Sequence, residues 1–419
     1  MGGHAMKQQN KKKPALPSRQ PTATQAPFVP GFTAAGVHAG IKKGKALDLA
    51  LLVPDPPARV AGIFTRNRIQ SPAVQISRER VRSGTCSAVL INSGNANACT
   101  GPQGRRDAEA ACAWAADRLA VDPGKVLVAS TGVIGVRLPT DRIRKALPGL
   151  AGRLRPEGLQ EASEAIQTTD RFPKTAWAWA RVGKKRVTLF GMAKGAGMIS
   201  PNLATMLAFF LTDLEAPVPA LRSLLKEGAA RSFNRINVDG DSSTNDTVLL
   251  LASGRAGNAA ALPGSPEYRA FASLLFPMME ELAYKIVKDG EGATKVVEIR
   301  VQGARTRAEA RRLAYRLANS SLVKTSFYGC DPNWGRLMAA TGSAGVAVDP
   351  ARIDISYDRV PLVRKGICSS DRELARTVEV LKQDFFTVTI DLHVGEGVCS
   401  VLTSDLTHDY VTLNASYRS

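Results

Sequence analysis

Short apolar segments of strand length alternate with longer helical segments along most of the chain, and this alternation most limits the possible fold. Val126–Ser130 (VLVAS) and Thr205–Asp213 (TMLAFFLTD) have the composition of buried strands. Asp107–Leu119 and Pro266–Asp289 have the apolar spacing of helices. This order predicts layered α/β or α+β packing but not a strand order. Because the longest apolar runs are far shorter than a bilayer span, we expect no membrane segment.

The remaining elements follow from the same patterns, with Gly and Pro at the turns. Further strands are expected at Ala46–Val53, Ala61–Thr65, Ser87–Asn92, Lys185–Leu189, Val248–Ser253 and Lys295–Gln302. Further helices are expected at Pro139–Leu147, Glu157–Ile166, Pro219–Arg231, Thr306–Leu322, Trp334–Thr341 and Asp371–Lys382. The last ten residues, YVTLNASYRS, resemble a terminal strand.

The chain is strongly basic, with 56 Lys+Arg against 37 Asp+Glu and a formal net charge of +19. Residues 1–26 contribute five basic residues and no acid, and we expect a disordered basic tail over residues 1–29. The other basic residues are spread along the chain, aromatics are only 6%, and no nucleic-acid-binding motif occurs. The composition therefore favours a basic soluble enzyme over a specific nucleic-acid-binding protein.

Several catalytic classes lack support. The chain has four histidines, no G-x-S-x-G elbow and no G-x-x-x-x-G-K-[ST] phosphate loop. Its six cysteines form no C-x-x-C pair and no Cys/His group with zinc spacing, so no metal site is expected. Sparse, scattered cysteine fits a reducing compartment, and we expect a cytoplasmic protein.

The most informative stretch is KGAGMISPNLATMLAFFLTD, residues 194–213. Gly195 and Gly197 allow unusual backbone conformations, and Pro201 stiffens the turn before Ala204 and Thr205. One hypothesis is that the Thr205 hydroxyl attacks the Ala204 carbonyl, so that hydrolysis leaves Thr205 as a new N-terminus. Its α-amine, with a pKa of about 8, would then accept the hydroxyl proton without any histidine. On spacing alone, a threonine that opens an ordinary core strand is the commoner case.

At these residues the chain resembles the glutamate N-acetyltransferase (ornithine acetyltransferase) family of arginine biosynthesis, from about Pro30 to Ser419. The matching motifs are AGIKKGKALDLALL, NSGNANACTG, STGVIG, TTD, KGAGMISPNLATML, SFNRINVDGDSSTNDT, DGEGATK, VKTSFYGCDPNWGR and the terminal NASYRS. So many long motifs in order make the resemblance specific.

The resemblance implies an α/β, layered-sandwich fold of the ornithine-acetyltransferase/aminopeptidase-like N-terminal-nucleophile type, with a smaller C-terminal α/β lobe from about residue 300. It implies autocatalytic cleavage between Ala204 and Thr205 into an α chain (30–204) and a β chain (205–419), assembled as α2β2. The implied reaction moves acetyl from N2-acetyl-L-ornithine to L-glutamate through an ester on Thr205. It needs no cofactor, and some members also accept acetyl-CoA as donor.

The resemblance also implies the site residues. Thr131 and Gly132 form the oxyanion hole, where such donors each stabilise a tetrahedral intermediate by about 3–4 kcal/mol; a Thr-Gly turn at a strand end is otherwise common. The implied substrate-binding residues are Thr168, Lys194, Thr205, Glu291, Asn414 and Ser419. Taken alone, Lys194 and Glu291 would be ordinary solvated loop residues.

Two alternatives stay open. A self-processed chain could be an N-terminal-nucleophile amidohydrolase or aminopeptidase instead of a transferase. A non-enzymatic basic binding protein would instead show tight, steeply salt-dependent nucleic-acid binding.

Overall fold

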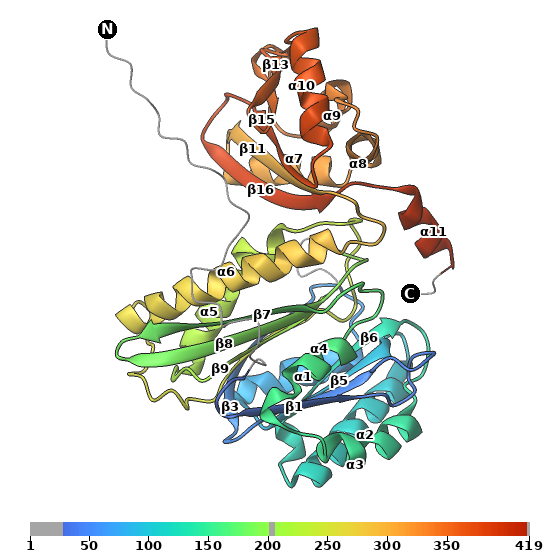
Figure 1. Cartoon of the computed structure of the whole chain (residues 1–419), viewed down its shortest axis with the longest axis vertical. Coiled ribbons are helices and arrows are strands. Elements are labelled where there is room, and N and C mark those ends of the chain that lie inside the picture. Colours follow the sequence, from blue (N-terminus) through green and yellow to red (C-terminus); the bar gives the residue numbers. More distant parts are fainter. Residues whose placement is uncertain (1–27, 201–205, 417–419) are drawn as a thin grey trace.

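The computed structural model describes residues 28–200 and 206–416, which form three β-sheets with helices packed on their faces (Figure 1). Two sheets stack face to face, and the third, near the C-terminus, forms a separate layer. The layered α/β sandwich expected from the sequence is confirmed. In the described ranges, no helix combines the length and the hydropathy needed to cross a bilayer.

The first sheet has the order β1-β2-β5-β6, and its last two strands are parallel. Its outer face packs against three helices, with small residues such as Ala108 and Ala115 allowing close approach. The strands are β1 (Phe32–Val37), β2 (Leu49–Pro54), β5 (Ala88–Asn95) and β6 (Val126–Val133), and the helices are α1 (Pro72–Arg80), α2 (Gly101–Leu119) and α3 (Thr140–Ala151).

The second sheet has the order β4-β3-β10-β9-β8-β7 and is covered on one face by two helices, α5 (Val218–Arg231) and α6 (Pro266–Lys288). Its strands are β3 (Ala58–Phe64), β4 (Thr85–Cys86), β7 (Lys174–Val182), β8 (Lys185–Lys194), β9 (Leu207–Thr212) and β10 (Thr247–Ala252). Strand β9 is buried along its whole length: Phe209 faces the first sheet and Phe210 faces the helices. This double burial explains its continuous apolar run. Helix α4 (Leu159–Ala165) adds Leu159 to the core between the sheets.

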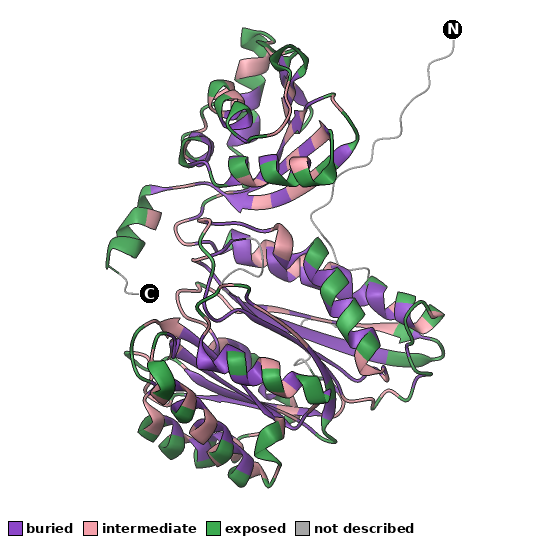
Figure 2. Cartoon of the chain, turned by 180° about the vertical axis from the view of Figure 1, so that it is seen from behind, coloured by how far each residue is buried: buried purple, intermediate pink, exposed green. Residues whose placement is uncertain are grey.

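The third sheet has the order β14-β13-β12-β15-β11-β16 and its own apolar core. Its strands are β11 (Val296–Ala304), β12 (Asp354–Tyr357), β13 (Val360–Arg364), β14 (Ile367–Cys368), β15 (Phe385–Asp391) and β16 (Gly397–Ser404). The helices that follow β11 are α7 (Arg307–Ala318), α8 (Ser321–Tyr328), α9 (Trp334–Gly342), α10 (Asp371–Leu381) and α11 (His408–Ser416). Figure 2 shows the strands of the stacked sheets buried and α11 exposed.

The structure corrects three local predictions and adds elements that the sequence did not predict. The terminal strand is wrong: its β-branched residues lie in α11, because the Thr407 hydroxyl accepts a hydrogen bond from the Tyr410 amide and caps a helix. The continuous helix 306–322 is broken after Ala318, since Ser320 caps a new helix through the Val323 amide. Strand β8 runs on to Lys194, because Gly191 lets α6 pack directly on the strand. Strand β7 and helix α1 were not predicted at all.

Candidate active site

A pocket of about 140 Å³ lies where β6 and β8 end, beside the loop that leads into β10. It brings together six of the residues expected from the sequence, although they come from five separate segments. These are Thr131, Gly132, Thr168, Lys194, Glu291 and Asn414. The other three expected residues, Ala204, Thr205 and Ser419, lie outside the described residues.

Lys194 lies at the centre of this group. It is the last residue of β8 and pairs in register with Leu207 of β9, two residues after Thr205 in the sequence. Its ammonium donates to Thr131 Oγ1 at 3.1 Å, and the residue is only 3% exposed. Burial lowers the pKa of Lys194, and the carboxylate of Asp170 opposes that shift. A buried cation of this kind suits a substrate carboxylate.

Gly132 cannot be replaced without moving the backbone. Its φ is +130°, and a Cβ there would lie 2.3 Å from the carbonyl carbon of Gly94 in the neighbouring strand β5. Buried Asn245, in the loop that leads into β10, holds the strand before Gly132. It donates hydrogen bonds to the carbonyls of Ser130 in that strand and of Ala96 just after β5, both at 2.7 Å. Thr131 and Gly132 are therefore held rigidly at the pocket wall.

Asp170 organises two edges of the pocket. Its carboxylate accepts hydrogen bonds from the amides of Thr168 (2.9 Å) and Gly195 (2.8 Å) and pairs with the buried Lys174 at 2.5 Å. Burial alone would raise the pKa of Asp170, but Lys174, Lys194 and the backbone donors outweigh burial and hold it at about 2. The carboxylate stays ionised and fixes the chain on both sides of Lys194.

The turn before residue 201 is strained and anchored. Met198 has a φ of +57°, a left-handed conformation that costs a residue with a side chain roughly 1–2 kcal/mol. The Asp239 carboxylate accepts hydrogen bonds from the amides of Met198 (2.6 Å) and Ile199 (2.8 Å), which offsets this strain. Burial raises the pKa of Asp239 to about 6.

A second buried carboxylate holds the chain at Met206, directly after residues 201–205. Asp246 is fully buried, and its Oδ1 accepts from the Met206 amide at 3.1 Å, while the Met206 carbonyl accepts from Thr247. Burial raises the pKa of Asp246 well above its usual range. The chain is thus anchored at Asp239 before the undescribed segment 201–205 and at Asp246 after it.

Glu291 closes the pocket from the opposite side. Its amide donates to the Ala196 carbonyl at 2.9 Å, and its Oε2 accepts from Asn414 Nδ2 at 2.9 Å. A Cβ on Gly197 would lie 2.4 Å from that carboxylate, and one on Gly292 would lie 2.4 Å from the Tyr410 amide. The two glycines therefore let the turn and α11 approach Glu291 closely.

Four residues that shape the pocket were not among the site residues expected from the sequence: Asp170, Asn245, Asp239 and Tyr410. The available signals were the TTD motif and the polar stretch 239–246 of the SFNRINVDGDSSTNDT motif. Tyr410 gave no signal, because it was placed in a strand. Burial and the nearby carboxylates of Asp239 and Glu291 raise the pKa of Tyr410, so its hydroxyl stays protonated.

Comparison with known proteins identifies the family of the chain. A family model described as the ArgJ family matches residues 33–419. The chain belongs to the ArgJ family. This confirms the resemblance noted from the sequence and with it the enzyme class, an acyltransferase of arginine biosynthesis.

Three relatives illustrate the similarity. The arginine biosynthesis bifunctional protein ArgJ of Geobacter sulfurreducens is 48% identical over 93% of this chain and 100% of its own length. A crystal structure of the Bacillus halodurans protein of the same name is 38% identical and covers 49% of this chain and 96% of its own, with a TM-score of 0.47. A structure of ornithine acetyltransferase complexed with ornithine from Mycobacterium tuberculosis is also 38% identical, covers 42% of this chain and 96% of its own, and has a TM-score of 0.38.

Proposed function

We propose that the chain cleaves itself between Ala204 and Thr205 and then transfers acetyl from N2-acetyl-L-ornithine to L-glutamate through an acetyl ester on Thr205. The observation that carries this proposal is the convergence of a buried cation, a carboxylate and the Thr131–Gly132 strand end in one pocket. Met198, three residues before residue 201, lines this pocket, and Leu207, two residues after Thr205, pairs in register with Lys194.

Self-cleavage needs a carbonyl held beside a hydroxyl. The strained turn at Met198, fixed by Asp239, and the anchor of Met206 on Asp246 hold the described chain on both sides of residues 201–205. In the proposed step, Thr205 Oγ attacks the Ala204 carbonyl, the C–N bond breaks, and water hydrolyses the resulting ester. The products are a free Ala204 carboxylate and a free Thr205 amine. After cleavage, Asp239 still holds the first chain at Met198, and Asp246 still holds the second chain at Met206.

In the transfer reaction the Thr205 α-amine takes the proton of its own hydroxyl, and Oγ attacks the acetyl carbonyl of acetylornithine. The Gly132 amide and the Thr131 hydroxyl stabilise the oxyanion. Because Lys194 donates to Thr131 Oγ1, the hydroxyl hydrogen of Thr131 is free to point to the oxyanion. The amine proton passes to the departing ornithine. The glutamate amine then attacks the ester, its proton passes through the Thr205 amine to Oγ as the C–O bond breaks, and acetylglutamate leaves.

The charges of the pocket fit these substrates. Lys194 pairs with the α-carboxylate that both substrates carry, and Thr168 and Asn414 donate at the edges. Glu291 receives the δ-ammonium of ornithine, and Ser419 contacts substrate at the chain end. We further propose that the α and β chains assemble as α2β2 in the cytoplasm, where the six free cysteines are stable. Acetyl-CoA is proposed as a second donor.

The experiment is a denaturing gel, end-group sequencing and an acetyl-transfer assay on wild type, Thr205→Ala and Thr205→Ser. We expect two bands of similar size for the wild type, with one chain starting Thr-Met-Leu-Ala, and a single inactive band for Thr205→Ala. Thr205→Ser keeps the hydroxyl and retains cleavage. A Thr205→Ala variant that still cleaves or turns over contradicts the nucleophile, and acetate release that exceeds acetylglutamate formation favours a hydrolase.

A further inference from the structure

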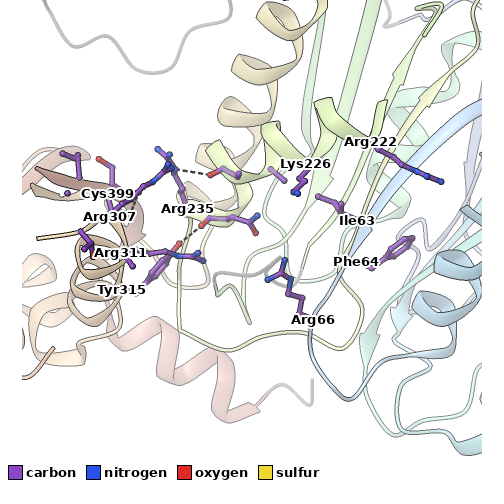
Figure 3. Close-up of a pocket in the computed structure, with 18 of the residues that line it drawn as sticks. Ile63, Phe64, Arg66, Arg222, Lys226, Arg235, Arg307, Arg311, Tyr315 and Cys399 are labelled. Atoms are coloured by element: carbon purple, nitrogen blue, oxygen red, sulfur yellow. Dashed lines mark hydrogen bonds between the residues drawn. The ribbon is translucent and has the colours of Figure 1, made fainter. Parts of the chain in front are cut away.

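A second, wide cleft lies away from the pocket above. Its volume is about 1360 Å³, and none of its described lining residues also lines the active-site pocket. Nine arginine or lysine residues line it, against a single acidic residue, Glu396. In Figure 3, Arg222 and Lys226 lie on one side of the cleft, and Arg307 and Arg311 on the other.

Both helices place like charges one turn apart on the side that lines the cleft. Arg222 and Lys226 are four residues apart on α5, and Arg307 and Arg311 are four residues apart on α7. Like charges at this spacing destabilise a helix. Within the described residues, the side chains of Arg222, Lys226 and Arg307 form no ion pair or hydrogen bond. The repulsion between Arg222 and Lys226 is therefore not offset by an ion pair with any residue that the structure describes.

The start of α7 adds to the positive charge. Thr306 caps this helix, and Thr306, Arg307 and Ala308 all line the cleft. The N-terminus of a helix carries a partial positive charge and favours anions, so Arg307 at the first helical position is opposite to what helix stability prefers. A bound anion would meet backbone amides and guanidinium groups at one place.

The arginines of this wall also converge on common neighbours. Burial raises the pKa of the Cys399 thiol, and Arg235, Arg311 and Arg307 all oppose that shift. The guanidinium group of Arg311 also lies over the ring of Tyr315, 5.4 Å from its centroid. On the opposite wall, Arg78 lies 5.6 Å from the centroid of Phe64. A guanidinium group thus lies over one face of each ring, so the cleft presents charge more than free stacking surface.

We propose that this cleft binds a small anion with at least two phosphate groups. Guanidinium forks and helix N-termini match phosphate oxygens, and cations on two facing walls require more than one anionic group. The cleft is large enough for a nucleotide. Inorganic polyphosphate and the polyphosphate chain of a nucleotide or coenzyme share this chemistry. The inference goes beyond the proposed transfer reaction and does not depend on it.

The test is calorimetric titration of the full chain with inorganic triphosphate and, separately, with ATP, at about 150 mM NaCl, where free charges are screened over about 8 Å. We expect one saturable site per chain. Arg305 also lines the cleft, beside Arg307. The double variants Arg222→Ala/Lys226→Ala and Arg305→Ala/Arg307→Ala should each weaken binding at least about tenfold. Tighter binding of ATP than of triphosphate would identify a nucleotide, and equal binding would identify the phosphate chain alone.

The matched control is Lys184→Ala/Lys185→Ala. It removes the same charge from two exposed residues, one in the turn between β7 and β8 and the other at the start of β8. It should change binding less than about twofold. Retained acetyl transfer, or an unchanged melting temperature, shows that the cleft variants are folded. The proposal is overturned if the wild type shows no saturable triphosphate binding, if the control weakens binding as much as the cleft variants, or if duplex DNA binds while triphosphate does not.

Discussion

Replacing Lys174 by Met should destabilise the protein strongly and disturb the active site. The Lys174 side chain is 0% exposed, and its ammonium pairs with Asp170 at 2.5 Å and with Asp289 at 2.6 Å. Both carboxylates are also fully buried. Removing the cation from a buried ion pair leaves an uncompensated charge, which costs about 3–5 kcal/mol. Asp289 keeps Arg171 as a partner, so Asp170 bears most of the loss.

The effect should reach catalysis, because Asp170 also holds the amides of Thr168 and Gly195. The assay is urea unfolding followed by tryptophan fluorescence, with acetyl transfer measured on the same samples. Lys184→Met on the exposed turn is the control and should change stability by less than about 0.5 kcal/mol.

A double variant makes the reasoning sharper. Asp170→Asn combined with Lys174→Met removes both charges, so it should be more stable than the sum of the single effects predicts, by at least about 1 kcal/mol. The argument fails if Lys174→Met costs less than about 1 kcal/mol or if the two substitutions are simply additive.

Two further predictions follow from other parts of the site and fold. Gly132→Ala should lower kcat by about 10²–10³-fold, because the Cβ would meet Gly94 and displace the proposed oxyanion donor. Gly135→Ala is the control: its φ of +80° gives it a similar backbone strain, but its Cβ would have open space, so it should stay active. A Gly132→Ala kcat within tenfold of wild type would rule out this role. Burial raises the folded-state pKa of Asp213 to about 6, above its unfolded value, so its stabilising contribution is present below about pH 4 and is lost as pH rises through 6. Between about pH 4 and about pH 7.5, the free energy of unfolding in urea should fall by about 2–3 kcal/mol more for the wild type than for Asp213→Asn. Parallel pH profiles of the two proteins would contradict this prediction.

The local patterns predicted the interior of the fold well and its ends poorly. Strand β9 and helix α6 were predicted within a few residues, because long apolar periodicity leaves few alternatives. Strand β7 was not predicted because the face opposite its buried Ala176 and Ala178 carries two more apolar residues, Trp177 and Trp179, which blur the alternation of apolar and polar residues. Helix α11 was predicted as a strand because intrinsic preference favoured it, and only the Thr407 cap and the close approach at Gly292 decide otherwise.

The sequence by itself determined the layered α/β class, the family and the residues that gather in the pocket, because the motifs are long and each is local. It could not show that Asp170, Asp239 and Asp246 hold the chain on either side of Thr205, since those contacts join residues 25 to 41 positions apart. The basic cleft was equally hidden, because charge spread evenly along a chain becomes a surface only when separate helices face each other. Tertiary structure alone brings distant charges within a few ångströms, and burial then decides which of them stay ionised.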